Sequence, residues 1–106
     1  MTRVLFVCSR NRLRSPTAEE IFSETIGWEV ASAGLSPDAE EPLTGEVVQW
    51  ADLIFVMEKT HRARLARRFA GDLKNKRVIC LDIPDNYEYM QPELVALLEA
   101  KIKPFL

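Results

Sequence analysis

Four short apolar runs recur along the chain, and a segment with helical character follows each of them. The runs cover residues 3–7, 28–32, 53–57 and 77–81, and their β-branched and aromatic content predicts buried strands. Helices are expected at about 15–27, 43–51, 59–70 and 92–103, with Pro16 in the first turn of the first helix and Gly27, Gly71 and Pro104 as stop signals. Repeated strand–helix units predict an α/β fold with a parallel sheet covered by helices on both faces.

In a parallel sheet of this kind, ligands bind beyond the carboxyl ends of the strands. The informative segments are therefore those that follow Val7, Ser32, Met57 and Leu81.

Length and composition restrict the classes of protein that need to be considered. With 106 residues, we expect one domain over residues 1–106. A content of 47% hydrophobic and 28% charged residues is typical of a globular protein and argues against disorder. No apolar run reaches the length of a spanning helix or a signal peptide, so we expect a cytoplasmic protein without a membrane partner. Cys8 and Cys80 are then expected to be free thiols.

Charged residues are segregated along the chain. Residues 1–14 carry four arginines and no acid, residues 15–58 carry ten acids and no Lys or Arg, and residues 59–77 carry eight basic residues and one acid. The 59–77 block has the pattern of a solvated helix face. The four arginines at the start are different because they surround a cysteine, which indicates an anionic ligand.

The chemistry concentrates in the segment after the first strand, where Cys8 is followed six positions later by Arg14 and then by Ser15-Pro16. A loop that runs from a strand into a helix N-terminus presents backbone N–H groups and the positive end of a dipole, which together bind oxyanions. A cysteine there would have a stabilised thiolate and would act as a nucleophile. Arg14 can donate two N–H groups to two phosphoryl oxygens.

The pattern resembles the low-molecular-weight protein tyrosine phosphatases, whose hallmark is a hydrophobic strand ending in Cys-x5-Arg-Ser-Pro-x-Ala-Glu with Asn at the third x. The corresponding residues here are Val4-Leu-Phe-Val-Cys8, Asn11 and Arg14-Ser-Pro-Thr-Ala-Glu19. Weaker similarity continues through Ser32-Ala-Gly34, Ala51-Asp-Leu-Ile-Phe-Val-Met57, His61 and Leu65, and Asp82-Ile-Pro-Asp-Asn-Tyr87. The resemblance implies a Rossmann-like four-stranded parallel sheet. It also implies hydrolysis of phosphomonoesters through a phosphocysteine, without a metal or another cofactor.

The chain also departs from that family. Arg10 replaces the usual Gly before the Asn, and Arg12 replaces a small or aliphatic residue after it. Leu13 stands where many members have a second cysteine, so their protective disulfide is not expected. Asn86 replaces the Pro after the acid, and the segment between Gly34 and Ala51 is shortened.

Each candidate residue has a functional and a structural interpretation. Cys8 is favoured as the nucleophile over a role as a small core residue, and Arg14 as the phosphate ligand over a surface role. Ser15 can cap the helix, and the resemblance implies that it also assists departure of the thiolate. Asn11 is expected to organise the loop, because Asn tolerates a left-handed backbone. The predicted phosphate-binding loop is Ser9, Arg10, Asn11, Arg12 and Leu13, in which the two arginines are either solvated or draw in substrates with additional negative charge.

Two carboxylates compete for the role of general acid. Asp85 is favoured because it aligns with the acid of the family and lies on the loop, whereas Asp82 lies at the strand end. Tyr87 and Tyr89 either flank the leaving group or pack. His61 is expected to start a helix, and Cys80 to pack in the core. One histidine and two separated cysteines do not make a metal site.

The predicted function is that of a cysteine-dependent phosphatase acting on a phosphotyrosine protein or an aryl phosphate. The same chemistry on phosphorylated nucleotides or nucleic-acid ends is an alternative, suggested by the arginine-rich loop and the basic 59–77 block. Arsenate reduction needs resolving cysteines that Cys80 alone does not supply. A non-catalytic phosphate-binding module is the alternative from another class, and Cys8, Arg14 and Asp85 argue against it.

Overall fold

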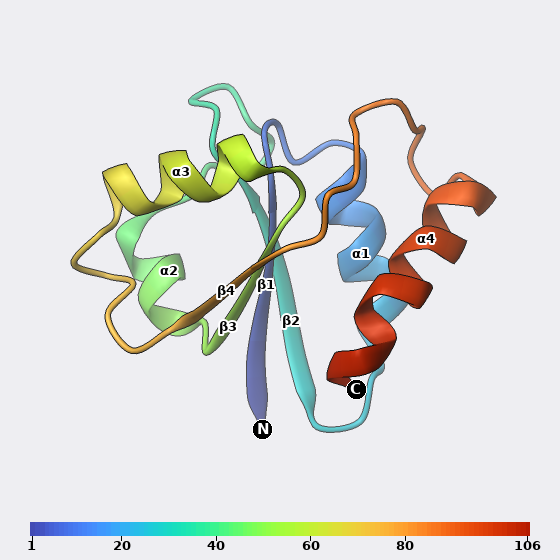
Figure 1. The fold of residues 1–106 in the computed structure, drawn as a ribbon, viewed down its shortest axis with the longest axis horizontal. Coiled ribbons are helices and arrows are strands. Elements are labelled where there is room, and N and C mark those ends of the chain that lie inside the picture. Colours follow the sequence, from blue (N-terminus) through green and yellow to red (C-terminus); the bar gives the residue numbers. More distant parts are fainter.

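A computed structural model describes residues 1–106 and contains a single four-stranded parallel sheet (Figure 1). The strands are β1 (Thr2–Cys8), β2 (Trp28–Gly34), β3 (Leu53–Val56) and β4 (Arg77–Cys80), in the order β2-β1-β3-β4. The helices are α1 (Arg14–Phe22), α2 (Gly45–Trp50), α3 (Lys59–Arg68) and α4 (Pro92–Ile102), followed by a short 3-10 helix, η1 (Lys103–Phe105). The predicted α/β, Rossmann-like architecture is confirmed, with a strand and a helix in each expected segment.

The central strand β1 is buried on both faces, which explains its unbroken apolar run. Val4 and Phe6 contribute to the core cluster on one face, and Leu5 and Val7 to the cluster on the other. Because β1 pairs with both β2 and β3, it lies between two hydrogen-bonded neighbours. The residues that follow Cys8 therefore lie at the carboxyl end of an inner strand, with a strand on either side.

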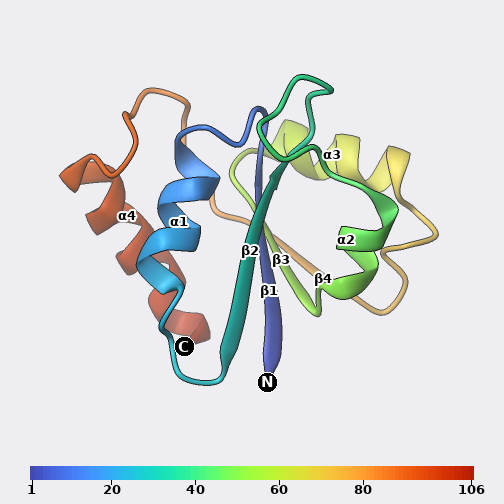
Figure 2. The ribbon, with the colours of Figure 1, turned by 180° about the vertical axis from the view of Figure 1, so that it is seen from behind.

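Helices cover the two faces in pairs. Helices α1 and α4 lie together on one face, and α2 and α3 lie on the other (Figures 1 and 2). The first pair covers a core that includes stacked rings of Phe6 and Phe55, whose centroids are 5.5 Å apart. The second pair covers Leu5, Val7 and Ile54 with Val48 and Leu65. The two layers leave the loops at the carboxyl ends of the strands free to form a site.

Helix α1 is shorter than the sequence pattern predicts, because it ends at Phe22 and not near Gly27. The hydroxyl of Ser23 donates to the carbonyl of Glu20 at the last turn, and the backbone N–H of Thr25 donates to the carbonyl of Phe22. The β-branched residues Thr25 and Ile26 disfavour further helix. Gly27 adopts a φ of 86° and turns the chain into β2.

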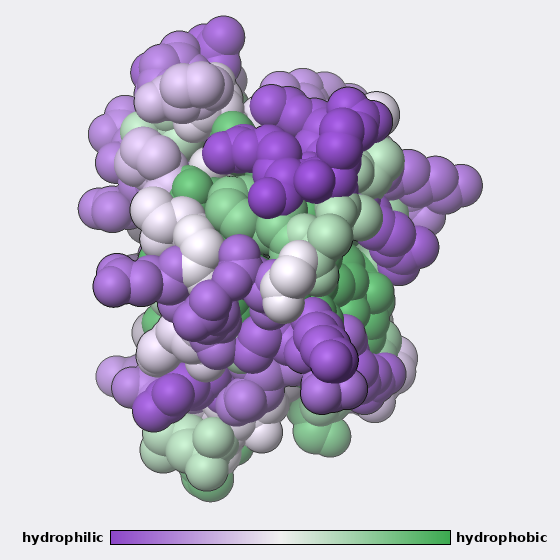
Figure 3. All heavy atoms as spheres, turned by 90° about the vertical axis from the view of Figure 1, so that its left-hand side faces the viewer, coloured by the Kyte–Doolittle hydropathy of each residue, from purple (hydrophilic) through white to green (hydrophobic).

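The basic block at 59–77 lies mostly on an exposed side of the molecule. Lys59, Arg62, Arg67, Arg68 and Arg77 are all solvent-exposed. Figure 3 shows the side formed by α2, α3 and the loop after α3, where hydrophilic side chains cover most of the visible face. The interpretation of this block as a solvated face agrees with these exposures. None of the helices combines the length and the apolar character needed to cross a bilayer.

Candidate active site

The loop between β1 and α1 wraps around the sulfur of Cys8. Asn11 has a φ of 56°, as expected for the loop organiser, and its backbone N–H lies 3.3 Å from Cys8 Sγ. The hydroxyl of Ser15 lies 2.9 Å from the same sulfur and 2.9 Å from Asn11 Oδ1. The Asn11 amide and the Ser15 hydroxyl thus both lie against the sulfur, and Asn11 Oδ1 also contacts that hydroxyl.

Ser15 does not cap α1, in contrast to one of the two roles expected for it. The residue at the N-cap position is Leu13, and no side chain makes a capping hydrogen bond there. When Cys8 is a thiol, it can donate to Ser15 Oγ, and the Ser15 hydroxyl donates to Asn11 Oδ1. When Cys8 is a thiolate, the Ser15 hydroxyl can donate to the sulfur instead. The hydroxyl is therefore placed to follow the protonation state of the cysteine.

Several backbone N–H groups of the loop have no acceptor in the protein. The groups of Ser9, Arg10, Arg12 and Leu13 make no backbone or side-chain hydrogen bond. Successive unpaired N–H groups beside a helix N-terminus form an anion-binding concavity. The predicted loop thus has the donors that a bound phosphoryl group requires.

Arg14 is buried and anchored by one of its terminal nitrogens. Its Nη1 donates to Glu58 Oε2 and to the carbonyl of Ile83, each at 2.7 Å, and its Nε lies 3.7 Å from Asp85 Oδ1. The side chain is only 2% exposed. Because Nη1 is occupied, the Nε–Nη2 edge is the part of the guanidinium available for two phosphoryl oxygens.

The two competing acids lie in different places. Asp85 lines the same cavity as Cys8 and has a side chain that is 62% exposed. Asp82 lines a separate depression beside Lys59, and it accepts a hydrogen bond from Cys80 Sγ at 3.4 Å. The geometry favours Asp85 as the acid.

The buried His61 and the partly exposed Glu58 form a link that the sequence did not reveal. His61 is the third residue of α3, and its Nδ1 accepts from the backbone N–H of Glu58 at 3.1 Å, whereas the Glu58 side chain caps the helix. The Nε2 of His61 therefore carries the proton and donates to Ser9 Oγ at 3.0 Å. Burial, followed by the charge of Arg14, lowers the pKa of His61 to about 4. His61 starts a helix, as expected, but it also holds the phosphate loop.

Glu58 is beyond the reach of local sequence signals, because its position beside Arg14 depends on the order of the strands. It follows Met57 at the end of the third predicted strand, and β3 is the neighbour of β1 in the sheet. Residues that follow adjacent parallel strands meet at the same edge. That rule places Glu58 beside Arg14, although the strand order itself is not visible in the sequence.

A second loop, residues 35–44, packs against the phosphate loop. The backbone N–H groups of Leu35 and Ser36 donate to the carbonyls of Cys8 and Ser9. Gly34 permits this approach, because a Cβ atom there would lie 2.7 Å from the Ser9 carbonyl oxygen and 2.5 Å from Ala39 Cβ.

The same loop brings acids to the arginines. Glu40 pairs with Arg12 at 3.5 Å, with both side chains largely exposed. The hydrogen bond from Ser36, followed by the charge of Arg10, lowers the pKa of Asp38 below its usual value of 3.8.

The loop that carries Asp85 is tied down at its far end as well. Thr17 is buried in α1, and its hydroxyl donates to the carbonyl of Leu13 at 2.6 Å. The same oxygen accepts from the backbone N–H of Met90 at 3.0 Å. The 83–90 segment thus contacts α1 at both ends, through Arg14 and through Thr17.

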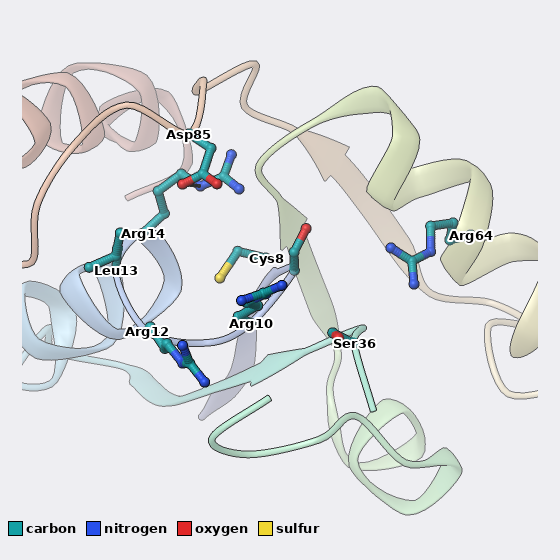
Figure 4. Close-up of a pocket in the computed structure, with 9 residues that line it drawn as sticks. Cys8, Arg10, Arg12, Leu13, Arg14, Ser36, Arg64 and Asp85 are labelled. Carbon is teal, nitrogen blue, oxygen red and sulfur yellow. Dashed lines mark ion pairs between the residues drawn. The ribbon is translucent and has the colours of Figure 1, made fainter. Parts of the chain in front are cut away.

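These elements enclose a cavity of about 610 Å³ (Figure 4). Its lining comprises Cys8, Ser9, Arg10, Arg12, Leu13, Arg14, Ser36, Arg64 and Asp85. Of the residues predicted for the loop, Asn11 alone is absent from this lining, since it is buried behind the loop. Ser36 and Arg64 were not predicted, because loop 35–44 and α3 reach the cavity only through the tertiary fold.

The remaining candidates lie outside the cavity. Tyr87 packs against the core cluster beneath α4, and Tyr89 is 50% exposed. Cys80 packs against the second core cluster, as expected, but it is only partly buried because β4 is an edge strand. No group of three or more His, Cys, Asp or Glu side chains is arranged to hold a metal ion.

Fold and site together define an α/β protein with a cysteine at the base of a loop of unpaired N–H groups. The sequence profile described as low molecular weight phosphotyrosine protein phosphatase matches residues 3–50. The N-terminal part of the chain, which contains the loop from Cys8 to Ser15, is thus similar to this family.

Individual relatives extend this similarity to the rest of the chain. The chain is 31% identical to a protein-arginine-phosphatase of Bacillus subtilis, over 62% of this chain and 62% of that protein. A low molecular weight protein tyrosine phosphatase from T. tengcongensis is similar in structure, with a TM-score of 0.77, 25% identity and 100% of both chains covered. A YwlE arginine phosphatase mutant with a phosphorylated active-site serine gives a TM-score of 0.73 and 25% identity, covering 98% of this chain and 95% of that one. The chain thus matches less than two thirds of its curated relative's length, and Asp85 lies outside the residues matched by the family profile.

Proposed function

We propose that this chain is a metal-independent phosphomonoesterase that acts through a phosphocysteine on Cys8. The observation that carries the proposal is the convergence on one sulfur of the Asn11 amide and the Ser15 hydroxyl, in a loop whose other N–H groups lack acceptors. A cysteine with only a packing role would need none of these donors. The phosphorylated active-site serine in the YwlE mutant supports a covalent intermediate at the corresponding place.

In the first step, the Cys8 thiolate attacks phosphorus in line and a P–S bond forms as the P–O bond to the leaving group breaks. The loop N–H groups and the free edge of Arg14 hold the equatorial oxygens, where negative charge is concentrated. Asp85 gives its proton to the leaving oxygen. These donors supply the charge stabilisation that a metal ion provides in other phosphatases.

In the second step, Asp85 takes a proton from water as the water oxygen attacks phosphorus. The P–S bond breaks, inorganic phosphate is released, and the thiolate recovers the electron pair. Ser15 donates its hydroxyl proton as a hydrogen bond to the departing sulfur, turning away from Asn11 Oδ1. The cycle closes without a net change in the enzyme.

The substrate class that we propose is a phosphotyrosine protein or another aryl phosphate. Phosphoarginine is a second candidate, because the curated relative is a protein-arginine-phosphatase. Four arginines and a single carboxylate line the cavity, however, and a released arginine side chain would be one more cation among them. Repulsion between these arginines and a guanidinium leaving group would disfavour its formation, so we favour aryl phosphates.

We also propose a cytoplasmic location and one phosphatase domain over residues 1–106. Cys8 and Cys80 are both free, and a thiolate nucleophile needs the reducing conditions that keep them so.

The test is hydrolysis of para-nitrophenyl phosphate, phosphotyrosine peptide and phosphoarginine peptide by the purified chain, with a chelator present. We expect turnover of the two aryl phosphates, none by Cys8→Ser, and retained binding of phosphate or vanadate by that variant. Full activity of Cys8→Ser would refute the nucleophile, and faster turnover of the phosphoarginine peptide would reverse the choice of substrate.

A further inference from the structure

The cavity is larger than a phosphoryl group requires, and its unused part is lined by cations. Its volume of about 610 Å³ falls in the range of roughly 300–1,000 Å³ that is typical of sites for whole small molecules. Cys8 lies at its centre, Arg14 and Asp85 lie on one side, and Arg64 of α3 lies on the opposite side (Figure 4). The space between Cys8 and Arg64 is therefore available to the leaving group.

Most arginines of the chain already have a partner. Three of them pair with carboxylates, namely Arg3, Arg12 and Arg14. Two donate to backbone carbonyls, Arg62 and Arg68, and Arg77 lies over an aromatic ring. The side chains of Arg10, Arg64 and Arg67 make none of these contacts. Of these three, Arg10 and Arg64 line the cavity and Arg67 does not.

The two unpaired guanidinium groups come from different elements. Arg10 belongs to the phosphate loop, and Arg64 belongs to the second turn of α3, where it is partly buried. Glu58, which begins α3, is already bound to Arg14. The charge of Arg10 acts on Asp38, whose pKa it helps to lower, but the two side chains form no ion pair within 4 Å. Asp38 accepts a hydrogen bond from Ser36 instead.

From this arrangement we infer a second anion-binding subsite, formed by Arg64 and Arg10, beside the phosphate loop. The preferred substrates are then phosphomonoesters whose leaving group carries its own carboxylate or phosphate. The inference rests on the proposed phosphatase activity and names the substrate class for it. Two unpaired guanidinium groups that line one partly enclosed cavity raise the local concentration of ligands with an additional negative charge and can hold that charge.

The test uses two substrates that differ by one charge, para-carboxyphenyl phosphate and para-carbamoylphenyl phosphate, whose ring substituent is neutral. The measured quantity is the ratio of their kcat/KM values. We expect the wild-type ratio to favour the carboxylate by about tenfold, as for one charge-assisted hydrogen bond. The preference should appear mainly in KM and should weaken as salt is added.

Matched variants assign the preference to Arg64. Arg64→Gln should bring the ratio close to that expected from the leaving groups alone, and Arg64→Lys should restore part of it. Arg67→Gln removes the same charge from the same helix outside the cavity and should leave the ratio unchanged. Asp38→Asn should increase the preference, because it removes the acid that competes for Arg10. An equal ratio in the wild type and Arg64→Gln would overturn the subsite.

A binding experiment separates failure of the subsite from failure of the phosphatase. Calorimetry with para-carboxybenzylphosphonate and para-carbamoylbenzylphosphonate needs no turnover. If Arg64 is required for tighter binding of the carboxylate while neither ester is hydrolysed, the subsite stands and the proposed activity falls. If both esters are hydrolysed and both phosphonates bind equally, the activity stands and the subsite falls.

Discussion

Ser9 and His61 are 52 positions apart in the sequence, yet Ser9 Oγ and His61 Nε2 are joined by a hydrogen bond of 3.0 Å. The bond fastens the first residue of the phosphate loop to the start of α3. Because the other ring nitrogen accepts from the Glu58 N–H, the histidine must be neutral to make both bonds. A single side chain thus makes the loop sensitive to acid.

The first prediction concerns stability and pH. The pKa of His61 is about 4 in the fold, against 6.5 for an unperturbed histidine. Above pH 6.5 neither state is protonated, and His61 adds no pH dependence. Between pH 6.5 and 4 the unfolded chain binds a proton that the folded protein excludes, so the free energy of unfolding decreases as the pH falls. By pH 5 the decrease should amount to about 2 kcal/mol.

Urea denaturation at pH 7.5 and pH 5 measures this decrease. The carboxylates titrate too, so the informative quantity is the difference between the wild type and His61→Gln, whose amide does not titrate. The same pH dependence in both proteins would contradict a neutral, buried His61.

A second prediction separates the two acids. Asp85→Asn should slow hydrolysis of tyrosine or alkyl phosphates by the ~10²–10⁴-fold typical of general acid catalysis. Substrates whose leaving group needs no proton should be affected much less. Asp82→Asn is the control, because Asp82 faces Cys80 in a separate depression. If Asp82→Asn alone shows the dependence on the leaving group, the acid is Asp82.

The two cysteines should differ in their response to phosphate. Cys8 lines the cavity, whereas Cys80 lies at the edge strand. Phosphate at about ten times its dissociation constant should slow iodoacetamide labelling of Cys8 about tenfold and leave Cys80 unaffected. Mass spectrometry of the labelled peptides measures both rates. Labelling of Cys8 that is indifferent to phosphate would contradict the phosphate-binding loop.

A fourth prediction concerns the contact between the two loops. Gly34→Ala places a Cβ 2.5 Å from Ala39 Cβ and 2.7 Å from the Ser9 carbonyl oxygen, so one loop must move. We expect a loss of about 1–3 kcal/mol in the free energy of unfolding and weaker inhibition by phosphate. Gly71→Ala is the matched control, since nothing lies within 4 Å of its added Cβ. Equal effects of the two substitutions would show that the contact is unimportant.

Local signals in the sequence were sufficient to place the strands, the helices and the loop from Cys8 to Ser15, although they extended the first helix beyond Phe22. An unbroken apolar run such as Val4–Val7 indicates a buried strand without knowledge of its neighbours. The partners of Arg14 could not be predicted in this way, because Glu58 is 44 positions and Ile83 is 69 positions away. Their approach depends on the strand order β2-β1-β3-β4, which periodicity does not encode.

The role of Ser15 shows a different reason for a partial prediction. A serine at the start of a helix is a common cap. Here the loop bends at Asn11, which has a φ of 56°, and the Ser15 hydroxyl contacts Cys8 Sγ and Asn11 Oδ1. Asn adopts a left-handed backbone more readily than most residues, but an Asn in the sequence does not guarantee that conformation. The sequence could therefore suggest both roles for Ser15 without choosing between them.

The two attachments of the 83–90 segment to α1 divide it into a stationary part and an adjustable part. Asp85 lies two positions from the carbonyl of Ile83 that Arg14 holds, whereas Tyr87 and Tyr89 lie toward the middle and the Thr17 end. Exchanges at Asn86, Glu88 and Tyr89, which are exposed and lie outside the cavity, should thus be tolerated while the acid keeps its place. An engineer who needs a place for a label or an inserted peptide would choose those three positions first.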